Sequence, residues 1–96
     1  MYSVEYTAHA TKDMNKLPAD IKTKIFNAIG KIKEDPYSHV KKLKMSAKTP
    51  LYSLRVGEYR VIMVIKDQLL IIQVIEVSNR SKIYRNYWAL TRSGSV

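Results

Sequence analysis

The stretch LYSLRVGEYRVIMVI, residues 51–65, decides the fold of this 96-residue chain. It predicts two β-strands joined by a tight turn, because Gly57 and Glu58 separate two runs of apolar and β-branched residues. A two-residue turn sets Arg55 opposite Arg60, which places both side chains on one face of the hairpin. Two like charges in directly opposed positions destabilise a sheet unless an anion joins them. The hairpin therefore predicts a surface that holds an anionic partner.

The acidic residues nearby offer a structural alternative, in which each arginine pairs with a carboxylate such as Glu58 or Glu76. Other chemistry finds little support, since there is no Ser-His-Asp pattern and no glycine-rich phosphate loop. The chain has no cysteine, and His9 and His39 lack the spacing of metal ligands. We therefore expect no metal and no other cofactor.

The charge balance points the same way as the hairpin. Seventeen Lys and Arg residues stand against eight Asp and Glu, a formal net charge of +9. Such an excess attracts anionic partners, of which nucleic acid is the commonest, although some small proteins are simply basic. No apolar signal region begins the chain, and no run approaches the roughly 18 apolar residues that a membrane span requires. We expect a cytoplasmic protein without membrane contact.

The rest of the chain predicts an α+β fold with β-α-α-β-β-β order. A short strand over residues 2–6 precedes a helix from about Thr7, and Pro18 lies in the first turn of a second helix that Asp35-Pro36 ends. The last strand, residues 69–77, is almost continuously apolar and should be central, with both faces largely covered. We expect an antiparallel sheet covered on one side by the helical hairpin.

Residues 37–50 form a lysine-rich segment without any acidic residue, with lysines at 41, 42, 44 and 48. Two interpretations stay open for it: a solvated basic loop, or an arm that contacts phosphates. Further along, Arg55, Arg60 and Arg80 come from three consecutive strands or their ends, and Tyr84 follows Arg80 by four residues. Because neighbouring strands lie about 4.8 Å apart, these side chains can gather around one phosphate.

Three segments together resemble the RelE/ParE toxin superfamily: KLK at 42–44, LYSLRVGEYRVI at 51–62 and EVSNRSKIY at 76–84. The shared pattern is a leucine-containing basic loop, an arginine-rich strand, a Gly-acid-Tyr-Arg turn and a closing Arg-x-x-φ-Tyr. The resemblance spans nearly the whole chain. It implies a RelE-like microbial RNase fold in a single toxin domain over residues 1–90, with a frayed tail over 91–96.

The resemblance also implies a function: the toxin of a toxin–antitoxin pair, acting as a ribosome-dependent, metal-independent endoribonuclease on mRNA. In that reaction the 2′-hydroxyl attacks the adjacent phosphate and leaves a cyclic phosphate end. Arg55, Arg60 and Arg80 would surround the phosphate, because guanidinium forks fit its oxygens. Tyr84 would act as the general base or stack on a nucleotide base. The remaining RNA contacts would come from Lys41, Lys42, Lys44, Lys48 and Ser53.

The implied partners are the ribosome, mRNA and an acidic antitoxin that masks the basic surface, in a hetero-oligomer. Departures from the family pattern leave alternatives open. Ser53 and Arg55 stand where several relatives have lysines, and Asn79 stands where many have a histidine. Both changes remove titratable groups, so proton transfer depends almost entirely on Tyr84. The alternatives are a ParE-like inhibitor of DNA gyrase and a catalytically silent basic binding module.

Overall fold

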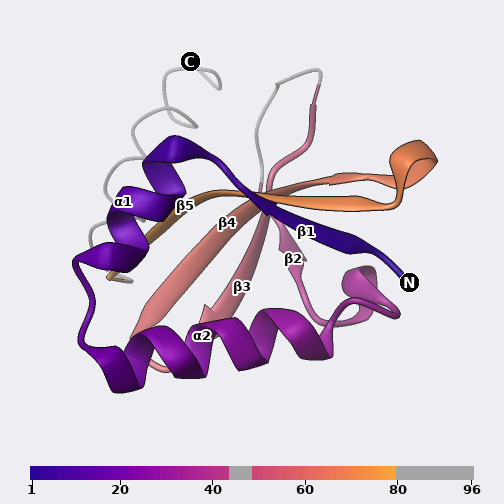
Figure 1. The fold of residues 1–96 in the computed structure, drawn as a ribbon. Helices are drawn as coiled ribbons and strands as arrows, with labels where there is room; N and C mark the ends of the chain where they lie inside the picture. Colours follow the sequence, from indigo (N-terminus) through magenta and orange to yellow (C-terminus); the bar gives the residue numbers. More distant parts are fainter. Residues whose placement is uncertain (44–48, 80–96) are drawn as a thin grey trace, which may run out of the picture.

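The computed structural model describes residues 1–43 and 49–79 of the chain (Figure 1). The α+β class and the predicted order of elements are confirmed, with one short additional strand. The elements are β1 (Ser3–Tyr6), α1 (Ala8–Asn15), α2 (Ala19–Lys31), β2 (Lys41–Lys42), β3 (Tyr52–Val56), β4 (Tyr59–Lys66) and β5 (Ile71–Asn79). Short 3-10 helices at Pro36–Ser38 and Asp67–Leu69 connect them. Neither helix of this part of the chain is long and apolar enough to cross a bilayer.

The sheet is mixed, which corrects the expectation of a purely antiparallel one. Its strand order is β1-β5-β4-β3-β2, and β1 runs parallel to β5 with Ser3 opposite Ile71. The other three pairings are antiparallel. A parallel pair needs a long crossover connection, and the two helices between β1 and the rest of the sheet provide it.

The two helices begin close to the predicted positions. Thr7 caps α1, because its Oγ1 accepts a hydrogen bond from the Ala10 N–H at 3.1 Å. Pro18 directly precedes the first residue of α2, where a missing N–H costs nothing. The predicted end of α2 at Asp35-Pro36 is wrong: the helix ends at Lys31. The chain then turns so that the Lys33 carbonyl accepts from the Tyr2 N–H at 2.9 Å.

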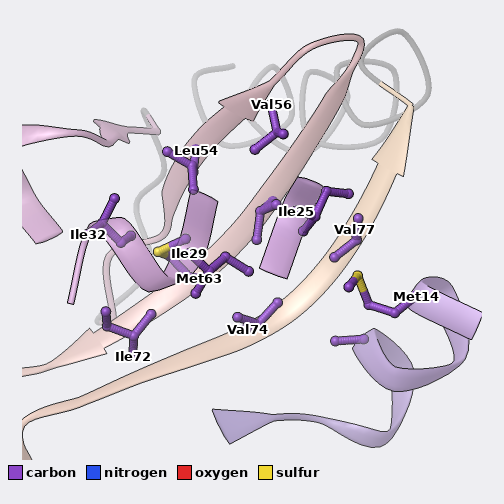
Figure 2. Packing of buried hydrophobic residues seen from close by; sticks show 12 residues of the cluster. Met14, Ile25, Ile29, Ile32, Leu54, Val56, Met63, Ile72, Val74 and Val77 are labelled. Atoms are coloured by element: carbon purple, nitrogen blue, oxygen red, sulfur yellow. The ribbon is translucent and has the colours of Figure 1, made fainter. Parts of the chain in front are cut away.

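The core lies between the helices and one face of the sheet. Figure 1 shows α1 near β5 and α2 near β3, in agreement with their packing contacts. Figure 2 shows the side chains of both helices meeting those of the strands. The buried apolar cluster consists of Ala10, Met14, Ile25, Ile29, Ile32, Leu54, Val56, Val61, Met63, Ile72, Val74 and Val77. The 3.6-residue apolar stripe of α2 and the alternation of the strands therefore meet on one face, as predicted.

A β-bulge in β5 changes which residues face this core. The register shifts between Ile62 and Met63, so that Ile75 of β5 has no directly opposed residue in β4. The buried residues of β5 are consequently Ile72, Val74 and Val77. Glu76 and Ser78 lie on the other face, where β5 is only half-buried. The residues of this face are partly buried and none of them is fully exposed, which agrees with the expectation that both faces of the strand are largely covered.

Beyond the end of β1, helix α1 and its N-cap lie along the edge of β5 and accept or donate the hydrogen bonds of that edge. The Thr7 N–H donates to the Val74 carbonyl at 3.0 Å, and the Val77 N–H donates to Asp13 Oδ2 at 3.0 Å. His9 Nε2 lies 3.4 Å from Asp13 Oδ2 and 3.8 Å from an oxygen of Glu76. A side chain thus satisfies a backbone donor of the strand edge, which fixes the carboxyl end of β5.

Candidate functional site

The hairpin of β3 and β4 has the predicted register. Arg55 lies opposite Arg60, and the intervening turn has Gly57 at φ +59°. An L-residue rarely adopts this conformation, so the turn favours glycine. A Cβ built at Gly57 would make only an ordinary contact with Lys24 Nζ, at 3.6 Å, so the backbone conformation rather than lack of space favours glycine. Local turn chemistry therefore brings the two arginines together on one face.

The two guanidinium groups extend in opposite directions along this face. Arg60 is only 8% exposed, and its Nη1 donates to Ser53 Oγ at 3.5 Å. Arg55 is exposed, and its Nε donates to the Gly57 carbonyl at 3.5 Å. This arrangement separates the like charges, because the side chain of Arg55 is held toward the turn and that of Arg60 away from it. A buried guanidinium costs desolvation energy, and the hydrogen bond to Ser53 offsets part of that cost.

We call the surface opposite the helices the arginine face. Strand alternation assigns its members, because Ser53 opposes Ile62, Ile62 opposes Glu76, and Arg60 opposes Ser78. The polar residues of this face from β2 to β5 that frame the site are Lys41, Ser53, Arg55, Arg60, Glu76 and Ser78. Three cations and one carboxylate give it a net positive charge, which suits a phosphate.

The lysine-rich segment is partly a strand, which the loop interpretation did not include. Lys41 opposes Ser53 and therefore lies on the arginine face. Lys42 opposes Tyr52, whose side chain packs against the core, and so lies on the other face. The two lysines cannot play the same role, although the sequence pattern alone predicted RNA contacts for both. Two others, Lys44 and Lys48, lie outside the described residues.

Arg80 and Tyr84 also lie outside the described residues. The strand that leads to them ends at Asn79, which lies opposite Tyr59 beside the turn. The gathering of Arg80 and Tyr84 around Arg55 and Arg60 therefore stays a prediction.

The two acids proposed as arginine partners occupy different places. Glu76 lies on the arginine face and reaches toward His9 of α1. Glu58 lines a cavity of about 220 Å³ between the turn and α2, together with Lys24. Ile21 and Val56 contribute apolar surface to the same cavity. Among residues 1–43 and 49–79, no group of three His, Asp or Glu side chains is arranged to hold a metal ion.

Tyrosines at the end of the sheet away from the turn serve as hydrogen-bond donors. The hydroxyls of Tyr2 and Tyr37 each donate to Asp67 at 2.8 Å. The hydrogen bond to Asp67 raises the pKa of Tyr2. The pKa of Tyr37 is raised mainly by burial and secondly by its hydrogen bond to Asp67. Burial raises the pKa of Tyr6 to about 12. Phenols with raised pKa values are poor general bases, so these three tyrosines serve the fold.

Comparison with known proteins shows the family and agrees with the fold. The model of the ParE toxin family of type II toxin–antitoxin systems, parDE, matches residues 4–84. The chain is similar in structure to the RelBE2 toxin–antitoxin complex of Mycobacterium tuberculosis, with a TM-score of 0.74 and 29% identity. That match covers 82% of this chain and 98% of that chain.

Two further solved structures share the fold at lower identity. The archaeal RelE–RelB complex of Pyrococcus horikoshii has a TM-score of 0.69 and 23% identity, over 82% of this chain and 94% of that chain. The isolated Escherichia coli RelE toxin has a TM-score of 0.66 and 22% identity, over 93% and 97%. Among curated proteins, none matches the chain significantly. The family model and the shared fold lead to one conclusion: the chain belongs to the ParE toxin family of type II toxin–antitoxin systems, within the RelE/ParE superfamily.

Proposed function

We propose that this toxin is a ribosome-dependent, metal-independent endoribonuclease that cleaves mRNA. The observation that carries the proposal is the opposed pair Arg55 and Arg60, of which Arg60 is buried and hydrogen-bonded to Ser53. A core sheet gains nothing from two opposed cations, whereas a phosphate between them turns repulsion into two charge-assisted contacts.

The reaction class follows from what such a site can stabilise. The 2′-oxygen of one nucleotide attacks the adjacent phosphorus, negative charge grows on the phosphate oxygens, and the bond to the 5′-oxygen breaks. The products are a 2′,3′-cyclic phosphate and a 5′-hydroxyl. Fixed guanidinium groups aimed at the growing charge lower the barrier, and more strongly where water is excluded, as around Arg60.

In this proposal, Tyr84 is the general base that removes the proton of the 2′-hydroxyl. A cluster of arginines favours the phenolate and would lower the pKa of a tyrosine from its usual value near 10. In the alternative role, Tyr84 stacks on a nucleotide base and orients it. Exchange of Tyr84 for Phe separates the two, because only a proton-transfer role predicts a rate loss of roughly 10²–10⁴.

The other residues proposed to take part in RNA binding are Ser53 and three lysines. The buried Ser53 hydroxyl accepts from Arg60, so its proposed part is to orient that arginine rather than to bind RNA itself. Lys42, together with Lys44 and Lys48, is assigned to the ribosomal RNA backbone, where lysine acts as a point charge. Action on translating ribosomes places the protein in the cytoplasm.

A cognate acidic antitoxin is the proposed partner. The structurally similar proteins from M. tuberculosis and P. horikoshii were solved as complexes of toxin and antitoxin. The net charge of +9 favours an acidic segment that covers the basic surface, in a hetero-oligomer of toxin and antitoxin.

A second function is favoured by one observation: the matching family model is that of the parDE toxins. ParE-like members of the superfamily inhibit DNA gyrase. The test is an in vitro translation reaction on a defined messenger, with cleavage sites mapped by primer extension, beside gyrase supercoiling. We expect cleavage within codons only when ribosomes are present. Intact messenger together with blocked supercoiling would show that gyrase inhibition, and not mRNA cleavage, is the function. No effect in either assay would refute both functions.

A further inference from the structure

We propose that Lys41 is the general acid of this site, the group that protonates the leaving 5′-oxygen. The inference rests on the proposed nuclease function and adds to it a residue from a separate strand. Its basis is the pairing of Lys41 with Ser53, which places Lys41 on the arginine face, directly opposite the serine that accepts from Arg60.

The ladder between β2 and β3 defines where Lys41 lies. The Leu43 N–H donates to the Leu51 carbonyl at 2.9 Å, and Lys41 opposes Ser53 two residues further along. Directly opposed residues have Cα atoms about 5.5 Å apart, and diagonal neighbours lie about 7–8 Å apart, within reach of long side chains. Arg55 is the diagonal neighbour of Lys41. A phosphate held by Arg55 and Arg60 is therefore within reach of the Lys41 amine.

The reaction needs a proton donor that the arginines cannot supply. Arginine keeps its protons in proteins, whereas an ammonium group releases one at a pKa near 10 in water. Ser53 and Arg55 occupy the hairpin positions of this face, and neither side chain is an effective acid. Lys41 is the lysine of the described residues that directly neighbours them on the arginine face.

The 2′-oxygen forms a bond to phosphorus while its proton passes to the general base. The bond between phosphorus and the 5′-oxygen breaks, and that oxygen takes a proton from Nζ of Lys41. A cyclic phosphate, a 5′-hydroxyl, a protonated base and a neutral amine result; the base then releases its proton to solvent, and the amine takes one from solvent.

Lys42 is the matched control for this role. It is the next residue, has the same charge, is exposed like Lys41, and belongs to the same two-residue strand. It lies on the opposite face, because it pairs with Tyr52. Long-range attraction to RNA is shared by both lysines, whereas proton transfer at the arginine face is open to Lys41 alone.

The test compares Lys41→Ala, Lys41→Arg and Lys42→Ala in single-turnover cleavage on translating ribosomes at saturating protein. We expect Lys41→Ala to lower the rate by roughly 10²–10⁴-fold, the usual contribution of acid–base catalysis. Lys41→Arg should not restore the rate, since it keeps the charge without donating a proton. Lys42→Ala loses a proposed contact to the ribosomal RNA backbone, so it should raise the protein concentration needed for saturation, whereas Lys41→Ala should lower the rate at saturation itself.

A second substrate makes the test specific for the acid. In a messenger whose bridging 5′-oxygen is replaced by sulfur, the leaving thiolate needs no proton. Lys41→Ala should cleave this linkage nearly as fast as the unaltered protein. Full activity of Lys41→Ala on the oxygen substrate, rescue by Lys41→Arg, or an equal defect on the sulfur substrate would each overturn the role. Inactivity of the unaltered protein would instead refute the proposed function, and this role with it.

Discussion

The two faces of one sheet differ in what their side chains do. On the core face, Val61, Met63 and Val74 are fully buried against the two helices. On the arginine face, the same strands carry Arg55 and Arg60. Apolar burial stabilises the fold, whereas a buried guanidinium costs free energy. Alternate residues of β3 and β4 are thus divided between the apolar core and the face that we propose to bind RNA, so each set can be altered separately.

The largest effect should come from the core face. Ile29→Ala removes a buried side chain of α2 from the cluster and should lower the free energy of unfolding by about 2–5 kcal/mol. Urea unfolding followed by circular dichroism measures it. Thr23→Ala on the exposed side of the same helix is the control and should change little. Equal stability of the two variants would contradict the assignment of this face as the core.

Arg60→Ala tests the other face with the opposite pattern. We expect its rate of mRNA cleavage to fall by roughly 10²–10³-fold, as for the loss of one donor to a charged transition state. Its stability should be little changed, because removal of a buried charge also removes a desolvation cost. Lys24→Ala, on the helix side of the same turn, is the control for general charge. A variant with unaltered cleavage would contradict the site.

Ser53→Ala sharpens the comparison within the arginine face. It removes the hydroxyl that accepts from Arg60 Nη1, and a typical net hydrogen bond corresponds to a loss of roughly three- to tenfold in rate. Ser78→Ala, opposite Arg60 on β5, should have less effect. A larger loss in Ser78→Ala would show that β5, rather than β3, orients the arginine.

The smallest expected effect is on the pH dependence of stability, through Tyr6, which packs against the core. Because burial raises the folded-state pKa of Tyr6 to about 12 from 10.0, the protonated phenol is favoured in the folded protein. The stabilisation is complete below about pH 10 and is lost as the pH rises toward 12. In Tyr6→Phe, urea unfolding should show a weaker fall in stability over this range, with Tyr2 and Tyr37 supplying the remainder. An unchanged fall would contradict the role of Tyr6.

The sequence predicted the parts of the fold that local rules determine. The register of Arg55 and Arg60 follows from the two-residue turn, and the helices follow from their apolar spacing. The parallel pairing of β1 depends on distant residues, and no local pattern carries it. The bulge at Ile75 lies within an almost uniformly apolar run, which hides the change of face.

The same distinction between local and distant determinants applies to the candidate site. Arg55, Arg60 and Ser53 do lie on one face, as strand alternation required. The different places of Lys41 and Lys42 depend on pairing with β3 across a segment of the chain, which composition cannot reveal. A strand of two lysines has no apolar residue to mark it, although the alternation rule would have separated them once the pairing was known.

The most direct test of the account is a cryo-electron-microscopy structure of the toxin on a ribosome. The programmed messenger would carry a 2′-O-methyl group in the codon, which removes the nucleophile and prevents cleavage. We predict that the arginine face meets the messenger, with Arg55 and Arg60 within hydrogen-bonding distance of the phosphate that follows the modified nucleotide. A toxin that turns its helices toward the messenger, or that leaves both arginines away from phosphate, would contradict the account.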